Sequence, residues 1–234
     1  MPNIESSAIL YTAKMVYDFH THTCISDGAL SPLELVRRAL VNNYRAIAIT
    51  DHVGTGYLER LITEIAADCV LAEQHWDIDA IPGVELTHLP AAAIAETAKK
   101  AKQIGAKIVV VHGETTAEPV EQGTNLAAVK SPYVDILAHP GLITLEEAQL
   151  AAANDVYLEI TARRLHSSTN QHVAQIARLA GAKLLINSDA HTELDLLTPE
   201  LANSIATAAA LTQNEIADVL HNNPLNLISK LLAR

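Results

Sequence analysis

The chain has 234 residues, of which 49% are hydrophobic and 18% charged, and its formal net charge is −11. This length suits one domain with a single core, and no apolar run approaches the roughly 20 residues that a membrane span requires. The negative charge disfavours a general nucleic-acid surface, because such surfaces gather Lys and Arg against phosphates. The two cysteines are too few for a disulfide framework, so we expect a cytoplasmic protein.

Residues 1–14 are interpreted as an N-terminal extension, and a single domain is expected from residue 15 to residue 234. Short apolar runs recur along this region with helical segments between them. Seven runs predict strands, at residues 15–19, 46–50, 80–86, 107–111, 135–138, 156–160 and 183–187. Most of them are continuously apolar, which is typical of parallel strands covered on both faces. The alternation of strand and helix predicts an α/β fold with one parallel sheet.

Helix start signals separate these runs. The segment SPLE offers Ser31 as an N-cap and Glu34 to close a capping box, and Thr144 and Thr212 repeat the same pattern. From about Leu197 the chain is expected to form a helical tail that packs on the barrel.

The histidines are informative through their positions. Six of the eleven lie at or just after the carboxyl end of a predicted strand, and three carboxylates lie at equivalent positions. In a parallel α/β barrel these strand ends form one face, where barrel enzymes keep their active sites. We therefore expect nine side chains at one mouth: His20, His22, Asp27, His52, Glu85, His112, His139, Asp189 and His191.

Imidazole and carboxylate together suit zinc, manganese or iron. His20 and His22 are two residues apart on an extended chain, so both imidazoles project to the same side and can reach one ion. Nine ligands exceed what one ion uses, so the sequence predicts two or three divalent metal ions. Any one of these motifs alone fits an ordinary histidine equally well, and it is their coincidence at six strand ends that favours metal binding.

The remaining histidines have other interpretations. His75 and His221 lie within predicted helices and are expected to face solvent or to cap a helix end. His88 follows Glu85 closely enough to approach the site. His166 and His172 flank the loop after the sixth strand, where they are candidates for outer-layer or substrate-binding groups.

Four motifs together resemble those of the PHP family, the polymerase and histidinol phosphatase domain of metal-dependent phosphoesterases. They are DFHTHTCISDG, AITDHV, AHPG and NSDAH, with PGVEL and VVVHGE between them. The resemblance implies a distorted TIM-like (β/α)7 barrel and a trinuclear site. It implies one ion among His20, His22, Glu85 and Asp189, a second at Asp27, His52 and His191, and a third at Glu85, His112 and His139, with Glu85 bridging.

The resemblance also implies hydrolysis of a small phosphate monoester, similar to histidinol phosphate, through attack of a hydroxide that bridges the metals. Arg163 and Arg164 are expected to supply a forked guanidinium contact to the phosphoryl group. The alternative that they are solvated arginines stays open. His166, His172 and metal-bound water are candidates for the acid that protonates the leaving group.

Three acids after the fourth predicted strand, Glu114, Glu118 and Glu121, suit a cationic part of the substrate, although solvated loop acids fit equally well. Two other functions are considered. One is a phosphodiesterase or exonuclease acting on nucleotides or single-stranded DNA, which the net charge disfavours. The other is a degenerate, non-catalytic PHP module, which the complete set of expected ligands disfavours.

Overall fold

The computed structural model describes residues 15–232, so the extension expected over residues 1–14 lies outside the described residues. All seven predicted strands are present, each within two residues of its expected start. One short strand, β3, was not predicted and contains His52. The strands are β1 (Val16–Asp18), β2 (Tyr44–Ile49), β3 (His52–Val53), β4 (Asp79–Leu86), β5 (Ile108–His112), β6 (Ile136–Ala138), β7 (Tyr157–Thr161) and β8 (Leu184–Asn187).

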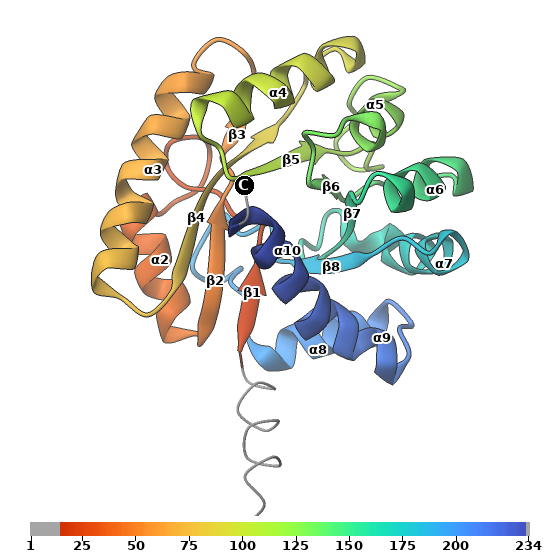
Figure 1. The fold of residues 1–234 in the computed structure, drawn as a ribbon. Helices are drawn as coiled ribbons and strands as arrows, with labels where there is room; N and C mark the ends of the chain where they lie inside the picture. Colours follow the sequence, from red (N-terminus) through yellow and green to blue (C-terminus); the bar gives the residue numbers. More distant parts are fainter. Residues whose placement is uncertain (1–14, 233–234) are drawn as a thin grey trace, which may run out of the picture.

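Helices follow the strands and surround them (Figure 1). They are α2 (Pro32–Val41), α3 (Leu58–His75), α4 (Ile94–Ile104), α5 (Thr124–Lys130), α6 (Leu145–Ala153), α7 (Asn170–Ala180), α8 (Pro199–Ala208), α9 (Gln213–Ala217) and α10 (Asn223–Leu232). Short helical turns cover residues 91–93, 167–169 and 218–222.

The predicted helix starts are largely confirmed. Thr144 and Thr212 each form a complete capping box. Ser31 accepts a hydrogen bond from the Glu34 backbone N–H, but the reciprocal contact expected of Glu34 is not formed. The Glu34 carboxylate instead accepts a hydrogen bond from Arg38 one helical turn away, at 3.0 Å.

The strands form a nearly closed parallel barrel, which confirms the predicted fold class. Their order is β1-β2-β4-β5-β6-β7-β8, with β3 beside β4. The seam between β1 and β8 is joined by hydrogen bonds of backbone groups and of the Asp18 and Asn187 side chains. The Phe19 backbone N–H donates to the Asn187 side chain at 2.9 Å, and the Asp189 N–H donates to the His20 carbonyl at 2.9 Å. The segments that follow β1 and β8 are thereby fixed against each other.

Alternate residues of the strands fill the inside of the barrel, while their neighbours pack under the helices. Ala46, Ala48, Ile108 and Val110 belong to an inner cluster that also contains Leu227 of α10. This helix lies across one end of the barrel in Figure 1 and closes it with an apolar face. Because both strand faces are buried in apolar surroundings, the strand sequences are continuously apolar.

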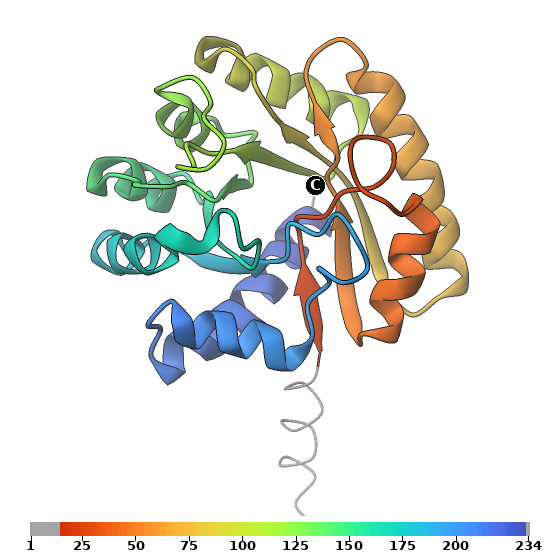
Figure 2. The ribbon, with the colours of Figure 1, turned by 180° about the vertical axis from the view of Figure 1, so that it is seen from behind.

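The opposite end of the barrel carries the loops after the strands (Figure 2). The segments after β1 and β8, red and light blue in that view, lie side by side there and are joined by a Thr21–Ala190 bridge. Among residues 15–232, no helix combines the length and the apolar character needed to cross a bilayer.

Candidate metal centre

The inner part of the site gathers side chains from both sides of the barrel seam. The His20 Nε2 atom lies 3.3 Å from Glu85 Oε1, and the His22 Nε2 atom lies 3.2 Å from Asp189 Oδ1. His139 Nε2 lies 3.6 Å from Glu85 Oε1 and 3.9 Å from Asp189 Oδ2. The Glu85 carboxylate, at the end of β4, therefore lies at the centre of this group.

The outer part of the site lies at the rim of the barrel mouth. Asp27 Oδ2 lies 3.1 Å from His191 Nε2 and 3.7 Å from His52 Nε2. The other nitrogen of His52 contacts Glu85 Oε2 at 2.6 Å and the Thr87 hydroxyl at 2.7 Å. His52 thus connects the rim to Glu85.

All nine side chains expected at the mouth are gathered in this cluster. His112 completes it, with its Nδ1 atom 3.3 Å from Glu85 Oε1. Four potential ligand atoms, one each from His22, Asp27, His52 and His191, lie within 4.8 Å of one another. Similar groups are formed by His20, His22 and Glu85, and by His52, Glu85 and His112.

The chemistry of these atoms fits divalent metal ions. Among the described residues, eight buried side-chain N and O atoms have no hydrogen-bond partner, and all eight belong to expected metal ligands. They are His20 Nε2, both ring nitrogens of His22 and of His112, both oxygens of Glu85, and His139 Nδ1. A buried polar atom without a partner is costly, and coordination to a cation would satisfy it. Imidazole nitrogens and carboxylate oxygens are common ligands of zinc, manganese and iron.

The protonation states of the metal-free cluster differ from one expected ligand to another. Burial lowers the pKa of His22 and of His139 well below the ordinary histidine value, so both rings are neutral at pH 7 and present free lone pairs. Burial opposes protonation of His20 as well, but the carboxylates of Glu159, Glu85 and Asp189 outweigh it and raise the His20 pKa. Burial raises the pKa of Asp189 to about 8.

The backbone is unusual at two of the expected ligands. His139 and Asp189 have positive φ values of 25° and 53°, which residues other than glycine rarely adopt. Gly28 permits another close approach, because a Cβ atom there would lie 2.5 Å from the His22 carbonyl oxygen. The "DG" pair after β1 thus lets the Asp27 loop fold back onto the backbone of His22.

A cavity of about 390 Å³ opens onto this cluster. Of the two arginines expected to contact the phosphoryl group, only Arg163 lines the cavity, with its Nη1 atom donating to the Asp189 carbonyl at 3.3 Å. Arg164 instead lines a neighbouring hollow, to which Arg163 also contributes.

The three additional histidines named near the site differ in position. His166 lines the cavity, and its Nδ1 atom lies 2.8 Å from the Thr115 hydroxyl. His88 lies on the cavity rim beside Glu118, at 3.2 Å. His172 is in α7, where its Nε2 atom contacts the Ile143 carbonyl at 2.8 Å, and it is not among the residues lining the cavity.

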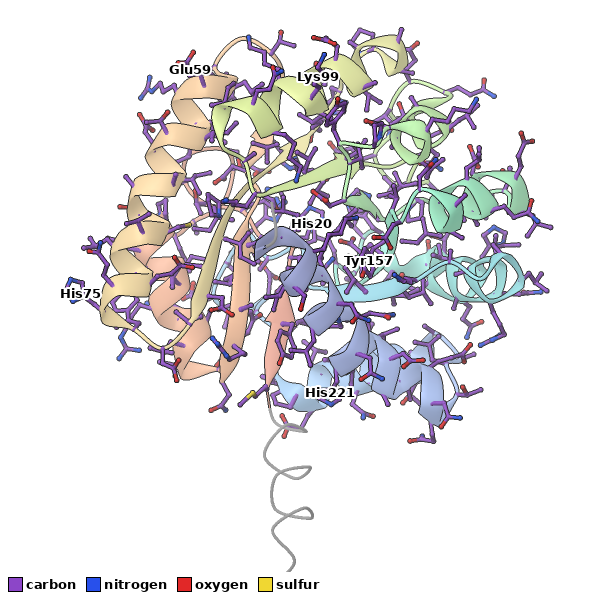
Figure 3. All side chains as sticks on the ribbon, in the orientation of Figure 1. His20, Glu59, His75, Lys99, Tyr157 and His221 are labelled. Carbon is purple, nitrogen blue, oxygen red and sulfur yellow. The ribbon has the colours of Figure 1, made fainter. Side chains whose placement is uncertain are left out.

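Figure 3 labels three histidines and shows the contrast between them. His20 lies near the centre of the barrel, whereas His75 points outward from α3 and His221 lies at the margin near α8. His75 and His221 are absent from the groups of potential ligands, as expected from their positions within helical segments.

Several buried polar residues that support the cluster were not anticipated. Glu159 contacts His20 Nδ1 at 2.8 Å, and Asp51 accepts hydrogen bonds from Thr23 and Ser26. The available signal was a charged residue inside the apolar run VYLEI and an aspartate directly before His52. Neither signal says which ligand the carboxylate contacts.

Comparison with known proteins gives relatives over nearly the whole chain. An uncharacterized protein of Methanocaldococcus jannaschii is 50% identical over 218 residues, covering 93% of this chain and 100% of that protein. A probable phosphatase of Thermoanaerobacter sp. is 27% identical over 94% of this chain and 95% of its own length. Ribonuclease P protein component 3 of Methanosarcina mazei is 26% identical over 92% and 89%, respectively.

Solved structures share the fold. A protein chain of archaeal ribonuclease P with mature tRNA superposes with a TM-score of 0.66 and 15% identity, covering 91% of this chain and 89% of that one. Histidinol phosphate phosphatase from Lactococcus lactis, complexed with zinc, L-histidinol and phosphate, gives 0.56 and 16%, covering 85% and 95%. The PHP domain model matches residues 18–160, a range that contains seven of the nine expected ligands, and this match confirms the resemblance drawn from the motifs. The chain therefore belongs to the PHP domain family.

Proposed function

We propose that the protein is a metal-dependent phosphatase that hydrolyses a small phosphate monoester in the cytoplasm. The observation that carries this proposal is the group of eight buried ligand atoms without hydrogen-bond partners, at the base of a cavity that also contains an arginine. The family and the relatives named probable phosphatases support it. The two or three ions expected here would activate water and stabilise negative charge on the phosphoryl group.

The residues of the chain have distinct roles in this proposal. The nine expected ligands hold the ions. Arg163, which lines the cavity beside Asp189, would donate to the phosphoryl oxygens through its guanidinium group. His166 lines the same cavity and is oriented by Thr115, so it is the better placed of the two histidines considered for the leaving group.

The three acids of the loop after β5, Glu114, Glu118 and Glu121, differ in whether they can contact a substrate. Glu114 accepts hydrogen bonds from the backbone N–H groups of Gly123 and Asn125, and Glu121 accepts one from Ala91. Only Glu118 lines the cavity. Glu118, which lines the cavity and is not one of the expected metal ligands, supports recognition of one cationic group, as in a phosphorylated amino alcohol such as histidinol phosphate.

A second candidate is hydrolysis of phosphodiesters in nucleic acid. The relatives from ribonuclease P favour it, because they match most of this chain and share its fold. The net charge of −11 weighs against it, since a polyanion would be repelled by most of the surface.

A direct test compares the two candidates on one preparation. Protein loaded separately with zinc, manganese or iron is incubated with a panel of phosphomonoesters, with single-stranded DNA and with RNA. Release of inorganic phosphate from a monoester, lost in His20→Ala, is the expected result. Nucleotide release without monoester turnover would favour the second candidate. Absence of both activities with every metal would support a non-catalytic module.

A further inference from the structure

Several fully buried carboxylates lie next to the cluster without belonging to the nine expected ligands, and two of them have side chains that contact an expected ligand's ring or the loop of another. Glu159 is on β7, and Asp51 follows β2. Each accepts several hydrogen bonds: Glu159 contacts the ring of His20, whereas Asp51 contacts the loop that carries Asp27.

Glu159 is surrounded by donors. Its Oε2 atom lies 2.8 Å from His20 Nδ1 and accepts from the Asn187 amide at 2.9 Å, while Oε1 accepts from the His139 backbone N–H at 3.3 Å. Because a carboxylate accepts, the proton of neutral His20 resides on Nδ1. The lone pair is then on Nε2, which faces Glu85 and has no hydrogen-bond partner.

This contact also explains why Glu159 acts through His20. A nitrogen that carries a proton cannot ligate an ion, so His20 offers only its Nε2 atom. All three neighbours of the Glu159 oxygens are donors. The amide of a glutamine would therefore bring an NH₂ group against at least one of them.

Asp51 organises a different segment. Its Oδ1 atom accepts from the Thr23 N–H at 2.7 Å and from the Ser26 N–H and hydroxyl at 3.2 and 2.6 Å. Its Oδ2 atom accepts from the Thr23 hydroxyl at 2.6 Å. These bonds fold the loop that carries Asp27. The Asp27 side chain is 53% exposed, so little packing holds it and its position depends on the loop.

We propose that Glu159 and Asp51 are positioning residues for two separately assembled parts of the metal centre. Glu159 sets the tautomer and orientation of His20 and fixes the backbone of His139, and thereby determines binding in the buried part. Asp51 fixes the loop of Asp27, and thereby determines binding at the rim. This inference rests on the proposed function only in that ions occupy the cluster.

The test counts ions instead of measuring turnover. Wild type, Glu159→Gln, Asp51→Ala and Asp27→Ala are stripped, reloaded with zinc over a range of free concentrations, and analysed for metal content. Loss of an outer hydrogen-bond partner of a metal ligand typically costs about 10–100-fold in metal affinity. We expect Glu159→Gln to weaken the buried sites by this factor and to keep the Asp27-dependent ion. Combining Glu159→Gln with Asp27→Ala then removes one further equivalent.

Asp51→Ala should lose the same equivalent as Asp27→Ala, and the double variant should lose no more than either single one. Cobalt absorption spectra provide a second readout, since each part of the centre contributes its own bands. Asp135→Asn is the matched control. It alters a buried carboxylate directly before β6, at the opposite end of the barrel, so it should lower the melting temperature without changing the metal count.

Wild-type zinc affinity in Glu159→Gln, or retention of the Asp27-dependent ion in Asp51→Ala, would overturn the inference. These outcomes leave the proposed function intact if wild type hydrolyses a monoester. Conversely, the predicted losses in a protein without hydrolytic activity would support the inference and reject the proposed function.

Discussion

The buried and the rim parts of the cluster differ in how much they depend on metal. The side chains of His20, His22 and Glu85 are 0% exposed, whereas those of His52 and Asp27 are 24% and 53% exposed. Water can satisfy polar atoms at the rim but cannot reach those inside. Ions in the buried part should therefore stabilise the fold as well as take part in catalysis, while an ion at the rim should exchange more readily.

The largest effect is expected from Glu85, whose carboxylate contacts residues of both parts. Glu85 contacts His20, His52, His112 and His139. Glu85→Gln should reduce both metal content and phosphate release by more than the roughly 100-fold seen at most for outer partners of ligands. Turnover assays with elemental analysis measure this. His75→Ala, on the outer face of α3, is the control and should change neither quantity. Full metal content in Glu85→Gln would contradict a shared role.

Stepwise metal removal should separate the two parts by stability. A chelator at increasing strength is expected to remove the rim ion first with little change in melting temperature. Removal of the buried ions should then lower the melting temperature, because a ligand present at 1,000 times its Kd stabilises the folded state by about 4 kcal/mol. Calorimetry on samples of known metal content measures the difference. Simultaneous loss of all ions would remove the distinction between the parts.

A smaller effect should appear in the pH dependence of metal binding. Burial lowers the pKa of His52, but the Glu85 carboxylate outweighs burial and raises this pKa to about 9. In the metal-free protein His52 thus holds a proton at pH 7, and the ion must displace it. Metal affinity should rise with pH up to about 9, with proton release on loading.

The raised pKa of His52 also predicts how the stability of the metal-free protein changes with pH. In the metal-free protein, protonated His52 contributes stability that is fully present below about 6.5, the unfolded value, and is lost as pH rises through about 9. Titration calorimetry of metal binding in two buffers of different ionisation enthalpy measures the proton release that accompanies metal loading. Metal affinity that does not change between pH 6.5 and 9 would contradict this account of the rim.

The position of the expected ligands could be predicted because strand ends in a parallel barrel share one face. A histidine that directly follows an apolar run, such as His112, needs only the strand assignment to be placed there. Asp27 is more remote, and its place depends on hydrogen bonds to Asp51 that no local pattern reveals. The sequence also does not distinguish Arg163 from Arg164, because side-chain direction just after a strand depends on the backbone of the loop.

Roles that depend on long-range contacts were beyond prediction. Glu159 and His20 are separated by 139 residues and meet only because the barrel brings β7 close to the end of β1. Likewise, the closure of one barrel end by α10 requires knowledge of which helix face meets the inner cluster. Composition and periodicity predict that a helical tail packs on the barrel, but not where.

The most direct test of the account is a crystal structure of the metal-loaded protein soaked with phosphate, with anomalous data collected at the zinc, manganese and iron edges. The account predicts two or three anomalous peaks among the nine expected ligands, with phosphate between the ions and the Arg163 guanidinium. A cluster that holds no metal, or phosphate bound away from the ions, would contradict it.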